Sequence, residues 1–288
     1  MVIAGWKDKF SLVVIYSTLI GLCIVVIFPL LYVISVSLTP YSQVLKHGGF
    51  LIFPREITLS AYKAFLNDGM IPHAFSVTVF ITVVGTFINL LLTSMMAYPL
   101  TKRYLPGRNV FLLLIVFTTL FGGGMIPTYL IVKATGLLDT VWAMIIPAAI
   151  GSFNLLVMKA FFENLPESLD EAARIDGAGE TSILVRIVLP LSLPIMATVG
   201  LFYAVGHWNE FFAAIIYISD RELHPLQVIL QTILRSTQNP EQLNVEETLP
   251  TVSLQMAAVV ITALPIICVY PFIQQYFTKG VLLGSVKG

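Results

Sequence analysis

Six long apolar runs constrain the fold of this chain more than any other feature of its sequence. They cover about residues 11–38, 74–100, 110–132, 140–162, 191–218 and 252–277. About 20 apolar residues in a helix cross the ~30 Å hydrocarbon core of a bilayer. Backbone groups in lipid must find their hydrogen-bond partners within the segment, so each run is expected to be helical. We therefore predict an all-α polytopic membrane protein with six transmembrane helices.

The composition agrees with a chain whose solvent is partly lipid. Apolar residues make up 57% of the 288 residues and charged residues 11%, whereas soluble domains carry roughly 25% charged residues. Sixteen basic residues balance sixteen acidic ones, so the excess positive charge typical of nucleic-acid binding is absent. The first run is far longer than the roughly 7–15 apolar residues of a signal peptide. We therefore expect a lipid bilayer as a partner, no nucleic acid, and a retained first helix.

Helix breakers lie inside several of the runs. Pro29, Pro127, Pro147 and Pro265 predict kinks, and Gly122–Gly124 predicts a loosened helix. These glycines are not followed by Lys-Ser or Lys-Thr, and the phosphate-loop pattern G-x-x-x-x-G-K-[ST] occurs nowhere in the sequence. The chain is therefore not expected to bind ATP, a metal or another cofactor by itself.

The distribution of Lys and Arg predicts the orientation. With the N-terminus inside, ten of the sixteen basic residues fall in inner segments and six in outer ones, as the positive-inside rule favours. Both termini are then cytoplasmic, and residues 39–73 and 219–250 are external. The second external segment is polar and contains a proline. It is either a solvated loop or a docking surface for an external partner, and its composition favours neither.

A charged loop interrupts the apolar pattern at residues 171–190, which read EAARIDGAGETSILVRIVLP. Asn164 to Asp176 is expected to form a short amphipathic helix, and Ser168–Glu171 has the pattern of a capping box. Gly177 is placed to end that helix in the left-handed conformation. A second helix is expected to start near Thr181 or Ser182 and to end at Pro190. Its apolar stripe is Ile183, Leu184, Ile187 and Val188.

Small residues surround the expected turn between these two helices, and charged residues flank them. The small residues are Ala172, Ala173, Gly177, Ala178 and Gly179, and the charged ones are Glu171, Arg174 and Asp176. Small side chains allow another protein to approach the backbone closely, and the charges can set its register. An interfacial linker parallel to the membrane is the alternative. From physical arguments alone, both interpretations stay open.

This loop resembles the cytoplasmic coupling motif of the permeases of binding-protein-dependent ABC importers. That motif reads EAA, three variable positions, G, nine variable positions and I-x-LP, which Glu171-Ala172-Ala173, Gly177 and Ile187-Val188-Leu189-Pro190 match. LSAYKAFLND, AYPLTKRYLPGR, IPTYL, WNEF and the ending LLGSVKG resemble the carbohydrate branch of these permeases, the maltose-importer type. FGGGMIPTYL and FNLLVMKAFF resemble more narrowly a sub-branch for acidic or complex oligosaccharides such as alginate or pectin fragments.

The resemblance covers nearly the whole chain and implies the type I fold of ABC importer permeases in a bacterial inner (cytoplasmic) membrane. Residues 1–73 would form the first helix and an external segment. Residues 74–277 would form the permease core of five helices, including the coupling loop 163–190 and the external loop 219–250. Residues 278–288 would form a cytoplasmic tail.

The resemblance also implies partners. A second, homologous permease would complete a heterodimer, and two cytoplasmic ATPase subunits would bind and hydrolyse ATP with Mg. An extracytoplasmic binding protein would deliver the sugar. This chain would not itself be an enzyme. The residues implied to contact the ATPase are Glu171, Ala172, Ala173, Asp176, Gly177 and Ala178 in the loop, and Gly284, Ser285, Val286, Lys287 and Gly288 in the tail.

The segment HWNEF at residues 207–211 carries polar groups inside the fifth run. Intramembrane ionisable residues are expensive and often functional, so Trp208, Asn209 and Glu210 are candidates to line a translocation path. Helix packing or an interfacial aromatic belt is the alternative. His207 and Glu210 also allow two rival functions, a proton-coupled secondary transporter and an intramembrane enzyme, but neither explains the charged loop. Other polar residues in the runs, including Asn89, Thr93 and Tyr203, are expected to make helix–helix hydrogen bonds.

Overall fold

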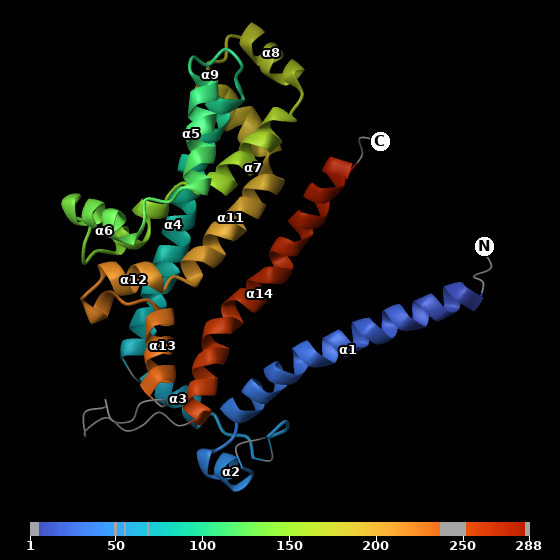
Figure 1. The fold of residues 1–288 in the computed structure, drawn as a ribbon, viewed down its shortest axis with the longest axis vertical. Helices are drawn as coiled ribbons and strands as arrows, with labels where there is room; N and C mark the ends of the chain where they lie inside the picture. The colour runs from blue at the N-terminus through green and yellow to red at the C-terminus, as the bar shows by residue number, and fades with distance from the viewer. Residues whose placement is uncertain (1–5, 49–50, 55, 68, 237–251, 286–288) are drawn as a thin grey trace. The chain divides into compact units, whose positions relative to one another are not determined.

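The computed structural model describes residues 6–48, 51–54, 56–67, 69–236 and 252–285, and every regular element in these ranges is helical (Figure 1). The all-α class predicted from the apolar runs is therefore confirmed. The elements are α1 (Trp6–Ser37), α2 (Tyr41–Lys46), α3 (Ser60–Asn67), α4 (Met70–Thr101), α5 (Arg108–Leu120), α6 (Met125–Ala134), η1 (Val141–Met144), η2 (Ile146–Ala148), α7 (Ser152–Glu163), α8 (Glu167–Ile175), α9 (Glu180–Ile183), η3 (Leu184–Val188), α10 (Leu189–Leu191), α11 (Leu193–Trp208), α12 (Phe212–Tyr217), η4 (Arg221–Leu223), α13 (Leu226–Ser236) and α14 (Val252–Ser285).

The described helices give three candidate spans, or up to six if each bent pair counts as one span, and the fifth of these covers residues 180–208 instead of the predicted 191–218. Three stretches are long and apolar enough alone, namely Phe10–Ser37, Met70–Thr101 and Val252–Val269. Three more are bent pairs: Arg108–Leu120 with Met125–Ala134 at 117°, Val141–Ala148 with Ser152–Glu163 at 52°, and Glu180–Leu191 with Leu193–Trp208 at 84°. Counting each pair as one span gives six candidate spans among the described residues.

The bend between α5 and α6 lies at the glycine run. The sequence predicts a loosened helix at Gly122–Gly124, whereas the structure shows a complete break. Gly124 has φ +84°, a conformation that residues with a Cβ rarely adopt, and it precedes the first residue of α6. Pro147 lies in η2, within the bent pair that ends with α7. Pro29 and Pro265 lie inside α1 and α14.

The chain forms two compact units. The first comprises Met1–Gly69 and Leu230–Leu264, and the second comprises Met70–Ile229 and Pro265–Gly288. Hydrogen bonds join distant parts of the first unit. The Thr58 amide donates to the Leu38 carbonyl at 2.8 Å, and Ser253 Oγ donates to the Thr39 carbonyl at 2.9 Å. The segment that follows α1 is thus tied both to the approach to α3 and to the start of α14.

The second unit is built around α4, which packs against α7 and α11, while α5 packs against α7 (Figure 1). Polar side chains join α4 to α11. Asn89 Nδ2 lies 3.0 Å from His207 Nε2, and Thr93 Oγ1 lies 2.8 Å from Tyr203 Oη. Asn89, Thr93 and Tyr203 therefore make the helix–helix hydrogen bonds expected of polar residues inside spans.

Loops predicted to share a membrane side gather at one end of this bundle. Residues 102–107 and 164–179 lie at the end that carries α8, and α12 lies at the other end (Figure 1). At the α12 end, the Asp139 amide donates to the Tyr217 carbonyl at 2.9 Å. The Asp139 carboxylate accepts a hydrogen bond from the Ser219 amide. This arrangement agrees with the predicted alternation of loops between two sides.

Candidate functional site

The charged loop folds into two short helices joined by a glycine turn, residues 176–179, which we call the elbow. Gly177 has φ +81°. The Ala178 amide donates to the Ala173 carbonyl at 2.9 Å, and the Gly177 amide donates to the Arg174 carbonyl at 3.0 Å. These are the two bonds of a Schellman motif. The predicted left-handed glycine at the end of the first helix is confirmed.

The predicted capping box at Ser168–Glu171 is wrong. α8 starts at Glu167, one residue earlier than the proposed cap, and Pro166 occupies the N-cap position with no side-chain cap bond in the described structure. Proline disfavours the helical conformation of the residue before it, here Leu165, so the helix does not extend back past Pro166. Glu167 and Asp170 still lie in the first turn, where the helix dipole favours acidic side chains.

The predicted coupling residues form a largely exposed surface at the elbow. Glu171, Ala172, Asp176 and Gly177 are exposed, Ala178 is half-buried and Ala173 is buried. No described atom lies within 4 Å of the position that a Cβ on Gly177 would take. A hollow of about 700 Å³ opens at this face. Ile175, at the end of α8, is 86% exposed. The surface thus combines an accessible backbone with one large apolar side chain.

The second arm of the loop differs from its prediction at both ends. α9 starts at Glu180 and continues through η3 and α10 to Leu191. Pro190 is the last residue but one of this stretch, which ends at Leu191, one residue beyond the predicted end. The 84° bend comes between Leu191 and Leu193. The predicted apolar stripe faces the core: Ile183, Leu184 and Val188 are buried and Ile187 is partly buried.

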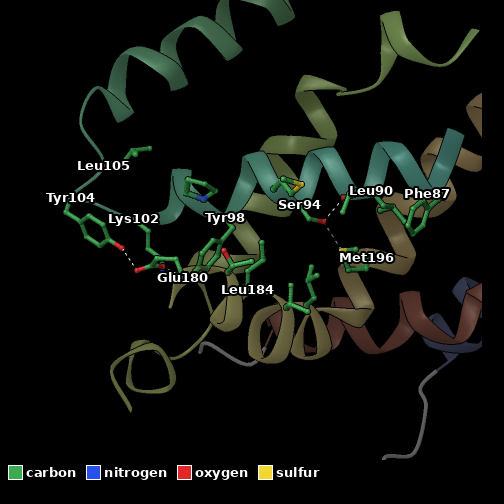
Figure 2. Close-up of a pocket in the computed structure, with 16 residues that line it drawn as sticks. Phe87, Leu90, Ser94, Tyr98, Lys102, Tyr104, Leu105, Glu180, Leu184 and Met196 are labelled. Carbon is green, nitrogen blue, oxygen red and sulfur yellow. Dashed lines mark hydrogen bonds between the residues drawn. The ribbon is translucent and has the colours of Figure 1, made fainter. Parts of the chain in front are cut away.

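Glu180 joins this second arm to three other segments. Tyr98 Oη of α4 donates to Glu180 Oε2 at 2.8 Å, and Tyr104 Oη donates to Glu180 Oε1 at 2.9 Å. Arg174 Nη2 of α8 lies 2.7 Å from the same Oε1. Figure 2 shows Tyr104 directed at Glu180, beside Tyr98 and Lys102. One carboxylate therefore receives donors from α4, from the loop after α4 and from α8.

A second ion pair reinforces this connection. Lys102 pairs with Asp170 of α8, and Lys102 Nζ lies 4.5 Å from the centre of the Tyr98 ring. Arg174 Nη2 donates to Tyr104 Oη at 2.8 Å. This hydrogen bond and the nearby acidic charges raise the pKa of Arg174. We call these six residues the elbow cluster: Tyr98, Lys102, Tyr104, Asp170, Arg174 and Glu180.

Sequence reasoning did not predict the elbow cluster, although it contained a usable signal. Residues 97–108 and the charged loop were both placed on the inner side. Basic and phenolic side chains of the first segment were therefore available to acidic side chains of the second. The pairing itself needs the fold, since Lys102 and Asp170 are 68 positions apart and Tyr98 and Glu180 are 82 positions apart.

An apolar groove runs from the elbow cluster along α4 (Figure 2). It has a volume of about 620 Å³, and Lys102, Tyr104 and Glu180 give it one polar end. Its apolar wall includes Phe87 and Leu184. The elbow cluster therefore lies where the apolar surface of α4 meets the charged loop.

The predicted translocation-path residues lie at the end of the bundle away from the elbow. Trp208 is buried, and its ring meets Phe75 edge-on at 5.9 Å. Asn209 is exposed, and its Oδ1 accepts a 3.4 Å bond from Gln227. The Glu210 carboxylate accepts a 2.9 Å bond from the Ala213 amide, which lies in the first turn of α12. Of the three residues, Asn209 presents the exposed side chain.

His207 does not pair with Glu210 within the part of the chain that the structure describes. Its imidazole is buried and bonds Asn89, while Glu210 bonds the backbone of α12. Among the described residues, no group of three or more His, Cys, Asp or Glu side chains is placed to hold a metal ion. The acid–base pair that both rival functions need is therefore not assembled here.

The predicted tail contact is only partly described. Gly284 and Ser285 form the end of α14. Val286, Lys287 and Gly288 lie outside the described residues. The role of the tail stays a prediction.

Comparison with known proteins gives a family match over most of the chain. The family described as "Binding-protein-dependent transport system inner membrane component" matches residues 90–283. Protein LplC of Bacillus subtilis (strain 168) is 47% identical over 273 residues, covering 93% of this chain and 92% of that protein. The "Polygalacturonan/rhamnogalacturonan transport system permease protein YtcP" of the same organism is 42% identical over 286 residues, covering 98% of this chain and 100% of that protein.

A solved structure shares the fold over nearly the full length. It is described as "Crystal structure of a bacterial ABC transporter involved in the import of the acidic polysaccharide alginate". The matching chain has a TM-score of 0.89 and 31% sequence identity, and the match covers 96% of this chain and 100% of that chain.

Proposed function

The chain belongs to the family of binding-protein-dependent transport system inner membrane components, and we propose that its elbow couples ATP hydrolysis in a partner subunit to sugar import. The chain is a permease subunit of an ABC importer for sugars or oligosaccharides. It is a multi-pass protein of the inner membrane.

The geometry of Gly177 carries the proposal. Its left-handed conformation and the Schellman bonds set the angle between α8 and α9. Its surroundings are open enough for a partner to reach the backbone, and the exposed Ile175 offers apolar contact beside it. An exposed turn of defined shape, attached to a transmembrane bundle, is suited to pass movement from a cytoplasmic subunit to the spans.

The chemistry that drives the movement would belong to partners. The sequence holds no phosphate-binding loop of the G-x-x-x-x-G-K-[ST] type, so two ATPase subunits would bind ATP and Mg. ATP binding there would shift this chain between two states only through contacts that differ between the states. A second permease would complete the pathway, and a binding protein would deliver the sugar from outside.

We propose that the substrate is an acidic oligosaccharide. The relative at 42% identity is named for polygalacturonan and rhamnogalacturonan, and the solved structure for alginate. Both kinds of polymer carry carboxylates. Asn209 would face the path, since its side chain is exposed. Its amide could hydrogen-bond a sugar whatever the charge of that sugar. The Glu210 carboxylate is instead directed at the start of α12, where it accepts a hydrogen bond from the Ala213 amide.

The test is the ATPase activity of the complete reconstituted complex: this chain, its partner permease, the ATPase subunits and the binding protein. The binding protein is added empty, with trigalacturonate or with the neutral maltotriose. We expect trigalacturonate to stimulate hydrolysis and Gly177→Asp to abolish the stimulation while the complex still assembles. The aspartate would place a side chain and a charge on the proposed contact.

Gly136 provides a matched control for this variant. It has φ +71° and the same two Schellman bonds after α6, from Leu137 to Val132 and from Gly136 to Lys133, both at 3.1 Å. Gly136→Asp thus imposes similar backbone strain away from the elbow. Full stimulation in Gly177→Asp would contradict coupling at the elbow. Equal loss in both variants would assign the effect to strain. Stimulation by maltotriose alone would contradict the acidic substrate and leave the coupling proposal intact.

A further inference from the structure

The two arms of the elbow are attached to the bundle in different ways. The second arm, α9 and η3, buries Ile183, Leu184 and Val188 in the core of the bundle. The first arm, α8, is described in full, and its buried residue is Ala173. Since apolar burial is the main source of packing stability, α8 has the weaker apolar attachment.

A polar hollow lies beside α8, between it, the end of α4 and the second arm of the elbow. It has a volume of about 670 Å³ and is lined by the loop after α4, the end of α7 and α8 itself. Lys102 and Asp170 both lie on its wall. Close packing normally fixes the orientation of a helix, but it cannot do so across such a hollow. The orientation of α8 therefore depends on the polar contacts that cross it.

Those contacts are supplied by the elbow cluster. Lys102 pairs with Asp170 of α8, and Glu180 joins Arg174 of α8 to Tyr98 and Tyr104. The side chains of Arg174 and Glu180 are 41% and 50% exposed, and exposed ion pairs contribute little to stability. The Arg174–Glu180 pair is thus poorly suited to hold the fold together, whereas the Lys102–Asp170 pair, with side chains 14% and 25% exposed, is less accessible to solvent. The elbow cluster is well suited to fix the orientation of α8, because the Glu180 carboxylate receives donors from three segments.

We propose that Asp170 and Glu180 are positioning residues for energy coupling, joining both arms of the elbow to the C-terminal end of α4 so that displacement of α8 moves α4. This inference rests on the proposed function. Glu180 lies on one side of the elbow and Asp170 on the other, and both reach the same end of α4 through Tyr98 and Lys102. The two arms and α4 then move as one body.

Hydrogen bonds connect α4 to α11, the helix that leads toward the proposed path. α4 is joined to α11 by Asn89 with His207 and by Thr93 with Tyr203. Asn209 directly follows α11. Movement of α4 would therefore reach the end of the bundle where the sugar is expected, through one continuous set of packed helices. Spatial continuity alone does not demonstrate coupling, so the test measures coupling directly.

The experiment uses the complete complex in proteoliposomes and compares sugar transported with ATP hydrolysed. The sugar is trigalacturonate or maltotriose, whichever stimulates the wild-type complex. In Glu180→Ala we expect assembly and hydrolysis to persist, while the sugar transported per ATP falls by about five-fold or more, the usual lower range of coupling effects. Lys102→Asp should act in the same direction. Adding Asp170→Lys, which restores an opposite-charge pair, should recover part of the ratio.

Glu163→Gln is the matched control. Glu163 pairs with Arg108 and Lys159, both at 2.7 Å, in the same region, but it does not belong to the elbow cluster. This variant should keep the wild-type ratio. A reduced ratio in Glu163→Gln equal to that in Glu180→Ala would overturn the specific role of the elbow cluster.

A second readout needs no sugar. Spin labels are attached to cysteines introduced at Ser168 of α8 and Met95 of α4, both exposed. Cys23→Ser and Cys268→Ser first remove the native cysteines, so that the label reacts only at the two chosen sites of this chain. In the wild type we expect the same distance without nucleotide and with ATP trapped by vanadate. In Glu180→Ala the distance should change or broaden on trapping. A wild-type distance that changes on trapping would overturn the proposal.

The possible outcomes separate the two proposals. If Gly177→Asp abolishes stimulation while Glu180→Ala keeps the wild-type ratio and distance, the positioning role is wrong and coupling at the elbow stands. If Gly177→Asp keeps full stimulation, coupling at the elbow is wrong, and the inference that rests on it falls as well.

Discussion

The imidazole Nε2 of His207 lies 2.6 Å from the position that a Cβ on Gly85 would take. Both residues are buried, and the same nitrogen lies 3.0 Å from Asn89 Nδ2. Gly85 therefore allows α4 and α11 to approach closely enough for an imidazole to fit between them. A small residue facing a polar pair is a common way to join helices in a membrane.

Gly85→Ala should destabilise the bundle. The added methyl group would meet the ring of His207, which has to move and lose its bond to Asn89. Overpacking of a well-filled core costs about 1–3 kcal/mol, so we expect a lower midpoint of thermal unfolding in detergent. Gly206→Ala is the control, because no described atom lies within 4 Å of its Cβ position. An unchanged midpoint in Gly85→Ala would show that the two helices are not closely packed here.

Tyr203→Phe should also weaken the bundle. Tyr203 Oη bonds Thr93 Oγ1 at 2.8 Å and accepts a hydrogen bond from the Gly151 amide at 3.0 Å. The variant leaves that half-buried amide without its acceptor, and the loss of such a hydrogen bond costs about 0.5–1.5 kcal/mol. The unfolding midpoint should fall, whereas Tyr16→Phe on the exposed face of α1 should leave it unchanged. Equal midpoints for the two variants would contradict the hydrogen bonds described here.

Asp139 should tolerate asparagine better than glycine, and glycine better than alanine. Its φ is +56°, where a Cβ costs about 1–2 kcal/mol unless the residue is asparagine or aspartate. Its carboxylate also accepts a hydrogen bond from the Ser219 amide. Asparagine keeps both properties, glycine keeps only the backbone conformation, and alanine keeps neither. Unfolding midpoints of the three variants test this order, and an alanine variant as stable as the asparagine variant would contradict it.

Glu210→Gln and Glu210→Ala should behave differently. Glutamine keeps an oxygen that can accept the bond from the Ala213 amide, whereas alanine leaves the start of α12 without it, at a cost of about 0.5–2 kcal/mol. We expect wild-type stability in the first variant and a lower unfolding midpoint in the second. The same midpoint in both variants would show that the carboxylate does not support α12.

Uptake in cells should depend on ATP and persist after an uncoupler removes the proton gradient. The same result is expected for His207→Gln, because a buried residue that joins two helices is not required to carry protons. Loss of wild-type uptake on uncoupling, with cellular ATP kept constant, would instead favour a proton-driven transporter.

Short-range features were predictable from the sequence because they depend on neighbouring residues. The lengths of the apolar runs predicted the spans, and Gly177 in its motif predicted the left-handed turn that the structure shows. The error at the start of α8 was also local. The sequence pattern favoured Ser168 as the N-cap, whereas the structure has Pro166 there; proline restricts the residue before it, so the helix does not extend further back.

The sequence by itself determined the class of the protein, the number of candidate spans and the position of the elbow, since hydropathy and backbone preference act over a few residues. Only the tertiary structure decided which polar groups meet. Asn89 and His207 are 118 positions apart, and Tyr98 and Glu180 are 82 positions apart. Such pairs depend on how helices pack, which no local pattern specifies. The elbow cluster exists because the packing of the bundle brings the end of α4 beside both arms of the charged loop.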